Sequence, residues 1–291
     1  MSYQIAVASG KGGTGKTTVA LNLFHFISKR VTGNVILADC DVEEPNAVLF
    51  CPEAVLVEET PVQQLIPVID GERCTYCRKC VEYCEFNAIV VIPPVRFAEV
   101  NPALCHSCGA CLVACEFKAI TERAEPIGSL KSYKLNERSG ILEGNLKIGS
   151  TMQTMMIRSL KKAIPAKADF VILDAPPGTS CPVVETVSDA DYVLLVTEPT
   201  PFGLHDLRLM VQMVREVGKP FGVVVNKSGL GDRNLYAYLA GEKIGILGEI
   251  PFDMTYASHY ATGDLFSGIP VEISNSYDAI MDNLLTKIQP V

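Results

Sequence analysis

The sequence predicts an α/β protein with a mostly parallel sheet, helices on both faces of that sheet, and one small inserted domain. Two observations support this prediction. Short apolar runs alternate with helical patterns through most of the chain, and a cysteine-rich internal repeat interrupts them once. The 291 residues, 48% of them hydrophobic, are enough to bury an α/β core beside a second small unit. We expect a discontinuous domain of residues 1–70 and 126–291, and an insert of residues 71–125.

Five short apolar runs predict the strands of the sheet. Each run ends in a polar or turn-forming residue. Near-continuous apolar composition is typical of parallel strands that are buried on both faces. The runs are Ile5–Ala8, Val35–Ala38, Phe170–Leu173, Tyr192–Val196 and Phe221–Val225.

Helical patterns follow or separate these runs, as in a parallel sheet with crossover helices. They lie at residues 17–29, 152–163, 204–217 and 232–243, and a last one covers roughly 276–288. In such sheets ligands bind at the carboxyl ends of the strands. We therefore expect the functional site among the residues that follow the strands, which are 10–18, 39–41, 174–178, 197–201 and 226–227.

The overall charge argues against two classes of partner. The formal net charge is −8 and the isoelectric point is near 5.1, whereas nucleic acid and anionic membranes are bound by basic faces.

No apolar stretch approaches the ~20 residues of a spanning helix. The first apolar run is too short for a signal peptide and lacks its basic leader. We therefore expect a cytoplasmic protein that begins at or near Met1 and binds neither nucleic acid nor membrane.

A glycine-rich loop lies between the first predicted strand and the first predicted helix. Residues 10–17 fit the phosphate-binding pattern G-x4-G-K-[ST] in the strand–loop–helix context that it requires, which disfavours a glycine turn without a ligand. Backbone N–H groups can cradle phosphate, Lys16 can reach the β and γ phosphates, and the Thr17 hydroxyl can bind Mg²⁺. The predicted nucleotide contacts here are Gly10, Gly12, Gly13, Thr14, Gly15, Lys16, Thr17 and Thr18.

Eight of the eleven cysteines form two runs of C-x2-C-x2-C-x3-C, 31 residues apart, and residues 85–89 resemble residues 116–120 at the same offset. This spacing suits two iron–sulfur cubes. Disulfides are disfavoured because the chain lacks an export signal, and zinc knuckles pair C-x2-C units across a longer gap. Two copies of one unit are expected to pack about a pseudo-twofold axis. The scattered Cys40, Cys51 and Cys181 are expected to be small buried hydrophobes.

The cysteine segment resembles bacterial two-cluster ferredoxins, in which the fourth cysteine of each run binds the other cluster. The resemblance implies a small α+β insert with two 4Fe-4S clusters. Glu85 and Glu116 stand where that family usually has proline, and the sign of their effect on the reduction potentials stays open. His106 is interpreted as a loop residue. The implied ligands are Cys74, Cys77, Cys80 and Cys115 for cluster 1, and Cys105, Cys108, Cys111 and Cys84 for cluster 2.

The glycine loop with Lys11 resembles the deviant loop of the MinD, ParA and nitrogenase iron-protein superfamily. Three further motifs match that superfamily on both flanks of the insert: Asp39-Cys40-Asp41, Asp174-Ala175-Pro176-Pro177-Gly178 and Asn226-Lys227. The resemblance implies ATP and Mg²⁺ as ligands and an ATP-dependent homodimer, in which Lys11 crosses to the partner's phosphates as an arginine finger does. Lys11, Lys16 and Asp41 are thus the predicted catalytic residues.

The same resemblance assigns the remaining site residues. Asp41 would orient the attacking water, and Asp39 and Asp174 would support Mg²⁺ directly or through water, although an isolated aspartate at a strand end is more often a cap. Gly178 would sense the γ-phosphate. Asn226 would contact the base, with Pro251, Phe252 and Asp253 near the adenine. His25, His205 and His259 receive no catalytic role.

The closest resemblance is to MinD-like ATPases with an inserted ferredoxin domain. It predicts ATP hydrolysis coupled to electron transfer or to redox-dependent binding of an unknown client. Two alternatives remain: an iron–sulfur assembly or carrier ATPase, and a positioning or signalling ATPase with structural clusters. The last helix carries Asp278 and Asp282, so Ile280, Leu284, Leu285 and Ile288 are interpreted as core residues rather than a membrane anchor. No C-terminal C-x2-C like that of cluster scaffolds is present.

Overall fold

The computed structural model describes residues 2–288, so Met1 and the side chain of Ile288 lie outside the described part. The chain divides into two compact units. The first comprises residues 1–59, 130–145 and 154–291, and the second comprises residues 60–129 and 146–153. The predicted insert of residues 71–125 falls within the second unit, which also takes in parts of two long strands. Each unit is described by itself.

The first unit is built on a sheet with the strand order β11-β10-β9-β1-β8-β2-β7-β6-β3. All pairings from β11 to β7 are parallel. The fold class is therefore confirmed, and the carboxyl ends of these strands meet at one edge of the sheet. The parallel strands are β1 (Tyr3–Ala8), β2 (Val35–Asp39), β7 (Ser139–Leu146), β8 (Phe170–Asp174), β9 (Tyr192–Thr197), β10 (Phe221–Ser228) and β11 (Ile246–Pro251).

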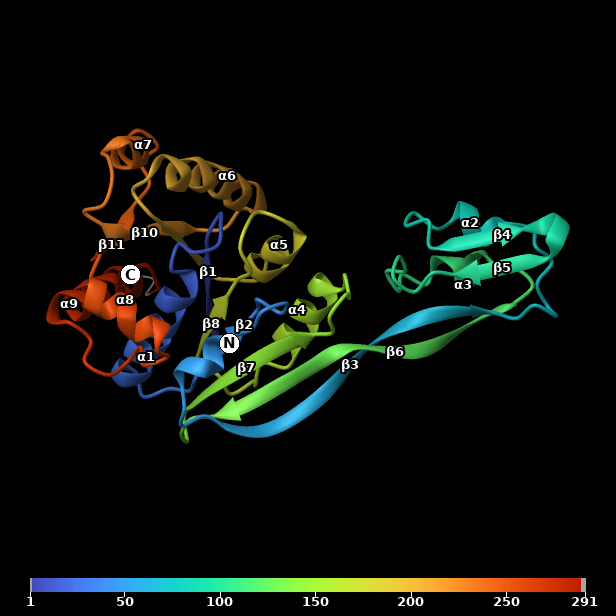
Figure 1. Cartoon of the computed structure of the whole chain (residues 1–291), viewed down its shortest axis with the longest axis horizontal. Helices are drawn as coiled ribbons and strands as arrows, with labels where there is room; N and C mark the ends of the chain where they lie inside the picture. The colour runs from blue at the N-terminus through green and yellow to red at the C-terminus, as the bar shows by residue number, and fades with distance from the viewer. Residues whose placement is uncertain (1, 289–291) are drawn as a thin grey trace. The chain divides into compact units, whose positions relative to one another are not determined.

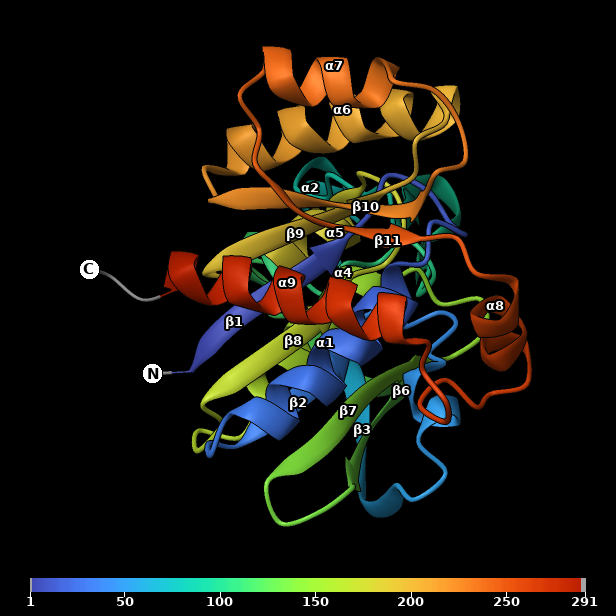
Figure 2. The ribbon, with the colours of Figure 1, turned by 90° about the vertical axis from the view of Figure 1, so that its left-hand side faces the viewer.

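Helices cover both faces of this sheet (Figure 1). On one face lie α1 (Lys16–Arg30), α8 (Met254–Ala261) and α9 (Val271–Ile288), and Figure 2 shows α1 and α9 lying across the strands. The other face carries α4 (Gln153–Lys162), α5 (Cys181–Val187) and α6 (Pro201–Val217), and α7 (Asn234–Gly241) packs on α6. Alternate strand residues such as Ile5, Val7, Leu194 and Val196 belong to the core that includes α1 and α9, as the two-residue period of a strand requires.

The last helix is longer than predicted and faces the core. α9 begins at Val271, directly after Pro270, five residues before the predicted start. Ile280 and Leu284 are fully buried and Leu285 is half-buried, which confirms their interpretation as core residues. No helix among residues 2–288 is long and apolar enough to cross a membrane.

One prediction about the scattered cysteines is wrong. Cys40 and Cys51 are buried as expected, but Cys181 is exposed. Cys181 is the first residue of α5, after the extended Ser180. A side chain at the first turn of a short surface helix projects from the protein rather than into a core, and the sequence offered no neighbouring pattern to reveal this.

Two long strands were not predicted. β3 (Val55–Ile69) and β6 (Ile120–Lys134) begin or end in the first unit and continue into the second. Their sequences give no regular strand signal, because prolines interrupt both and only a few positions, such as Val62, Gln64 and Ile66 of β3, alternate into a core. The 3₁₀ segment η1 (Ala47–Phe50) leads into β3.

The second unit is small. It contains α2 (Lys79–Glu82), α3 (Ala110–Ala114), the 3₁₀ turn η2 (Pro93–Val95), and an antiparallel pair of strands, β4 (Ile89–Ile92) and β5 (Phe97–Val100). Its buried core is a cluster of Ile89, Val91, Cys111 and Ile120. Helices of four and five residues are far below the length that is stable alone. The unit therefore depends on its other contacts.

The internal repeat is visible in the backbone. Residues with a left-handed backbone conformation (positive φ) recur 31 positions apart. The pairs are Tyr76 and Ser107, Arg78 and Gly109, and Asn87 and Lys118.

The two copies also exchange equivalent hydrogen bonds. The Asp70 N–H donates to the Ala119 carbonyl, and the Asn101 N–H donates to the Ala88 carbonyl, both at 2.7 Å. Each bond joins one copy to the other, as the pseudo-twofold arrangement requires.

Candidate functional site

The glycine loop connects β1 to α1 at the carboxyl edge of the sheet. Gly13 and Gly15 have φ angles of 77° and 87°, which side-chain-bearing residues rarely adopt. At Gly15 a Cβ atom would also lie 2.2 Å from the Asn226 amide nitrogen. Position 15 therefore requires glycine for two reasons: its backbone conformation and the close approach of Asn226 on β10.

Lys16 begins α1 and is buried against the end of β8. Its ammonium donates to the Asp174 carboxylate at 2.6 Å, with side-chain exposures of 7% and 1%, and lies 3.4 Å from the Thr17 hydroxyl. Burial alone would lower the pKa of Lys16, but the Asp174 carboxylate outweighs it, and the net pKa is raised. The second Asp174 oxygen, Oδ2, is buried without a hydrogen-bond partner.

The two aspartates after β2 have different surroundings. Asp39 is 1% exposed and accepts hydrogen bonds from the N–H groups of Asp41, Asn46 and Ala47 at 2.9–3.1 Å. Burial, followed by the nearby Asp174 carboxylate, raises the pKa of Asp39. Asp41 instead lines the cavity described below, and burial raises its pKa to about 6. Asp39 therefore fixes the loop that presents Asp41.

Lys11 is paired within its own chain. Its ammonium lies 2.6 Å from the Glu198 carboxylate, which also binds Lys227 at 3.1 Å, and Lys227 in turn donates to the Gly13 carbonyl at 2.9 Å. Burial alone would raise the pKa of Glu198, but hydrogen bonds from the two lysines outweigh it and lower the pKa. Glu198 was not singled out from the sequence, although it lies in the segment after β9 that the strand pattern marked.

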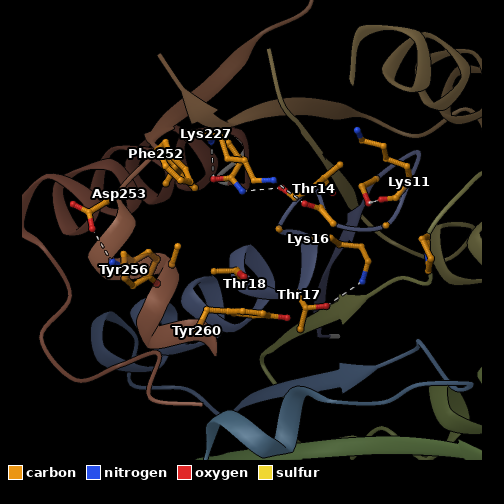
Figure 3. A pocket seen from close by; sticks show the side chains of 18 of the residues that line it. Lys11, Thr14, Lys16, Thr17, Thr18, Lys227, Phe252, Asp253, Tyr256 and Tyr260 are labelled. Carbon is orange, nitrogen blue, oxygen red and sulfur yellow. Dashed lines mark hydrogen bonds between the residues drawn. The ribbon is translucent and has the colours of Figure 1, made fainter. Parts of the chain in front are cut away.

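A cavity of about 330 Å³ surrounds the loop. Figure 3 shows Phe252, Asp253 and Tyr256 on one side of it and Lys11 on the other, with Lys16, Thr17 and Thr18 between them. The cavity also includes Tyr260, Tyr277, Asn46 and Pro251 in its lining, and Thr14 contributes a buried hydroxyl without a partner. None of His25, His205 and His259 lines it.

Several residues that were predicted to contact the nucleotide make hydrogen bonds within the protein instead. The Asn226 amide donates to the Thr14 carbonyl at 2.7 Å, and the Asp253 carboxylate accepts from the Tyr256 N–H at 2.7 Å as the N-cap of α8. The Gly178 N–H donates to the Ser9 carbonyl at 3.0 Å, while its neighbour Pro177 lines the cavity. Tyr256 and Tyr260 were missed because helix α8 itself was not predicted.

The second unit gathers cysteines from both repeats. One small cavity is lined by Cys74, Cys77 and Cys80 of the first run together with Cys115 of the second, beside Tyr76, Ile69 and Ile120. This is the crossed set that the ferredoxin resemblance implies for cluster 1. In the other crossed set, Cys84 of the first run packs against the buried cluster that contains Cys105 of the second run, and Cys108 and Cys111 lie near Cys105.

Backbone N–H groups donate to the cysteine sulfurs with the same symmetry. The Tyr76 and Ser107 N–H groups donate to Cys74 and Cys105, two residues earlier, at 3.4 and 3.5 Å. The Ala88 and Ala119 N–H groups donate to Cys84 and Cys115, four residues earlier, at 3.4 and 3.3 Å. Such donors stabilise sulfurs that carry negative charge.

Burial raises the pKa of the Cys80 and Cys105 thiols, and that of Cys111 to about 11. Among the described residues, no three His, Cys, Asp or Glu side chains are close enough to hold a single metal ion. The four ligands of a cube, by contrast, each bind a different iron and stand further apart. His106 lies in a loop, as expected, and its exposed side chain stacks on Phe86 with ring centroids 3.9 Å apart.

A left-handed glycine loop, a lysine at the start of its helix and acidic strand ends define a P-loop nucleotide-binding protein. The chain belongs to the CobQ/CobB/MinD/ParA nucleotide-binding domain family, which matches residues 5–266. It is therefore a P-loop ATPase of the MinD/ParA type.

Three similar proteins illustrate the range of the family. The uncharacterized protein MJ0578 of Methanocaldococcus jannaschii is 32% identical over 97% of this chain and 96% of its own length. An iron–sulfur cluster carrier protein of Pyrococcus abyssi is 26% identical over 99% of this chain and 87% of its own. The septum site-determining protein MinD of Pyrococcus horikoshii, solved with Mg-ADP, has a similar fold, with a TM-score of 0.58, 19% identity and full coverage of both chains.

Proposed function

We propose that this protein is an ATPase that holds two 4Fe-4S clusters in its second unit and couples ATP binding and hydrolysis to electron transfer or to redox-dependent binding of a client. One observation carries the proposal. The eight clustered cysteines form two crossed sets, each with symmetric N–H donors to sulfur.

The cysteine residues fit the proposed clusters in number, chemistry and surroundings. Four sulfurs surround one cavity, its lining is otherwise mostly apolar, and the donors that would support thiolate charge are already present. Cys74, Cys77, Cys80 and Cys115 would hold cluster 1, and Cys105, Cys108, Cys111 and Cys84 would hold cluster 2. Bound clusters supply reversible one-electron chemistry.

The P-loop side chains fit Mg-ATP. Oδ2 of Asp174 and the hydroxyl of Thr14 are buried and unpartnered, so both are available to a ligand or its water. We assign phosphate binding to the loop N–H groups and Lys16, Mg²⁺ binding to Thr17 with support from Asp174 and Asp39, and orientation of the attacking water to Asp41. The aromatic and proline residues 251–256 would surround the base.

The assignment of Lys11 requires a second chain. In the single chain its ammonium is paired with Glu198, and its side chain is 33% exposed. A partner's phosphates carry more charge than one carboxylate and would compete for it. We propose that ATP-dependent dimerisation exchanges the Glu198 pair for the partner's nucleotide.

A physical route between the nucleotide and the second unit runs through the segment after β2. Asp39 holds the N–H groups of Asn46 and Ala47, and η1 then leads directly into β3. Phe50, at the end of η1, stacks on Tyr260 of the nucleotide cavity with ring centroids 4.8 Å apart. A change at the γ-phosphate that moves this loop would therefore also move the start of β3.

The direct test of the clusters is metal content. Protein purified without oxygen should contain ~8 iron and ~8 sulfide per chain, because each crossed set supplies the ligands of one cube. Zinc at two per chain, without visible absorption, would contradict the proposal.

A carrier function is the second candidate, and the similarity to an iron–sulfur cluster carrier protein favours it. The two candidates differ in how firmly the clusters are held. Clusters that survive purification and reduce reversibly support electron transfer, whereas rapid loss to an apo-acceptor protein supports the carrier.

A further inference from the structure

The two cysteine runs are equivalent in backbone but not in charge. At positions related by the 31-residue repeat, Arg78 corresponds to Gly109 and Lys79 to Ala110. After the fourth cysteine, Lys118 of the second run corresponds to Asn87 of the first.

Because each proposed cluster takes ligands from both runs, these three positively charged residues all lie in loops that carry ligands of cluster 1. Arg78 and Lys79 line the cavity formed by Cys74, Cys77, Cys80 and Cys115, and Lys118 follows Cys115 by three residues. Three cations therefore belong to the loops around cluster 1, and the equivalent loops around cluster 2 contain none among Arg and Lys.

The carboxylates show the same difference. Glu116 and Glu85 directly follow the crossed ligands Cys115 and Cys84, so they occupy equivalent positions beside the two clusters. Lys79 pairs with Glu116 at 2.5 Å. Its counterpart is Ala110, and no ion pair involving Glu85 is present among the described residues.

Arg78 is held in an unfavourable conformation. Its φ angle is 70°, in the left-handed region where the second run has Gly109 at 72°. A side chain costs stability in this region. Glycine would fit this position without strain, so the first run differs from the second here by one positive charge.

The other charges near the runs fall on both sides and do not reverse this asymmetry. Glu72 lies two residues before Cys74, and Glu122 lies near Cys105 of the other set. Arg73 is paired with Asp70 at 3.4 Å. Glu82 lies on α2 between Cys80 and Cys84, which belong to different clusters, so its charge affects the reduction potentials of both clusters.

We propose that cluster 1 has the higher reduction potential, and that Lys79 and Arg78 set this order. The inference rests on the proposed function, because it requires both clusters. Reduction adds one negative charge to a cluster, which nearby cations stabilise and an unpaired carboxylate destabilises. A single electron supplied to the protein therefore resides on cluster 1 rather than cluster 2.

The test is a redox titration of the whole chain with dithionite at pH 8, followed by electron paramagnetic resonance. Wild type should show two separate one-electron waves. Lys79→Gln should lower the midpoint potential of the higher-potential wave and leave that of the other unchanged. Ala110→Lys should raise the midpoint potential of the lower-potential wave and leave that of the other unchanged. Lys147→Ala, an exposed lysine of the same unit outside both runs, should shift neither.

The difference between the two midpoint potentials should also become smaller at high salt, because Lys79 is 44% exposed and its charge is screened. Unshifted waves in both variants, or a Lys79→Gln shift confined to the lower wave, would overturn the inference while leaving the clusters in place. A wild-type protein without iron would overturn the proposed function and this inference together.

Discussion

The two candidate sites are built in different ways. In the first unit, residues from six separate strand ends converge, and charged pairs such as Lys16–Asp174 and Lys11–Glu198 already hold the site together. In the second unit, all eight clustered cysteines lie within residues 74–115 around a small core. Cys80 and Cys111 lie on very short helices, and the other six lie outside helices and strands. The nucleotide site is therefore preformed by the fold, whereas we propose that the second unit depends on its clusters for stability.

The largest effect is expected from a crossed cysteine. Cys115→Ser should lose cluster 1, and iron should fall from ~8 to ~4 or fewer per chain, because this sulfur completes the first run's set. The second unit should unfold at a lower temperature while ATP still binds. Cys181→Ser, an exposed cysteine outside the runs, should keep full iron content. Intact iron in Cys115→Ser would contradict ligation of a cluster by Cys115.

Lys16 tests whether the first site is preformed. Lys16→Met should reduce ATP hydrolysis by about 10²-fold or more, since it removes a phosphate clamp. It should also destabilise the nucleotide-free chain by about 3–5 kcal/mol, because Asp174 is left buried and unpaired.

The double variant Lys16→Met/Asp174→Asn separates these two effects. It should regain much of the free energy of unfolding in urea but none of the hydrolysis. Equal stability of the single and double variants would show that the ion pair does not hold the site.

The dimer prediction is tested by mixing inactive chains. Lys11→Ala and Asp41→Ala should each be nearly inactive, but a mixed dimer contains one site with an intact Asp41 and an intact partner Lys11. Equal mixing should restore about a quarter of wild-type hydrolysis, since about half of the dimers are mixed and each has one good site. Mixed dimers that form without activity would refute the role of Lys11 in the partner's site.

The smallest effect concerns Glu198. Its pKa is lowered in the folded chain, so its pairs stabilise the protein above the usual glutamate range and this contribution is lost as pH falls through the folded pKa. Glu198→Gln should therefore cost less than about 1 kcal/mol at pH 7 and less still below about pH 4. Urea unfolding at both pH values measures this, with the exposed Glu216→Gln as control. A cost that grows at low pH would contradict the pairing.

The sequence predicted the parallel sheet and the P-loop because both have local signals. Apolar runs mark β1, β2, β8, β9 and β10, and the glycine pattern needs no tertiary information. β3 and β6 were missed because prolines interrupt both and their buried positions do not alternate regularly along the strand. β11 and α8 were missed for lack of a clear period, and with them the aromatic side of the nucleotide cavity.

The partners of the site residues could not be predicted. Lys11 was expected at a dimer interface, but nothing local to Glu198 indicates that it pairs with Lys11, because 187 residues separate them. Likewise, the hydrogen bond from Asn226 to Thr14 joins residues 212 positions apart. Such contacts follow from the strand order, which single motifs do not contain.

The most direct test of the account is whether nucleotide state changes the clusters. Midpoint potentials of both clusters should be measured without nucleotide, with Mg-ADP, and with a non-hydrolysable ATP analogue, in wild type and in Lys16→Ala. The account predicts a nucleotide-dependent shift in wild type, consistent with couplings of about 1–3 kcal/mol, and no shift in Lys16→Ala. Identical potentials in all states of the wild-type protein would contradict it.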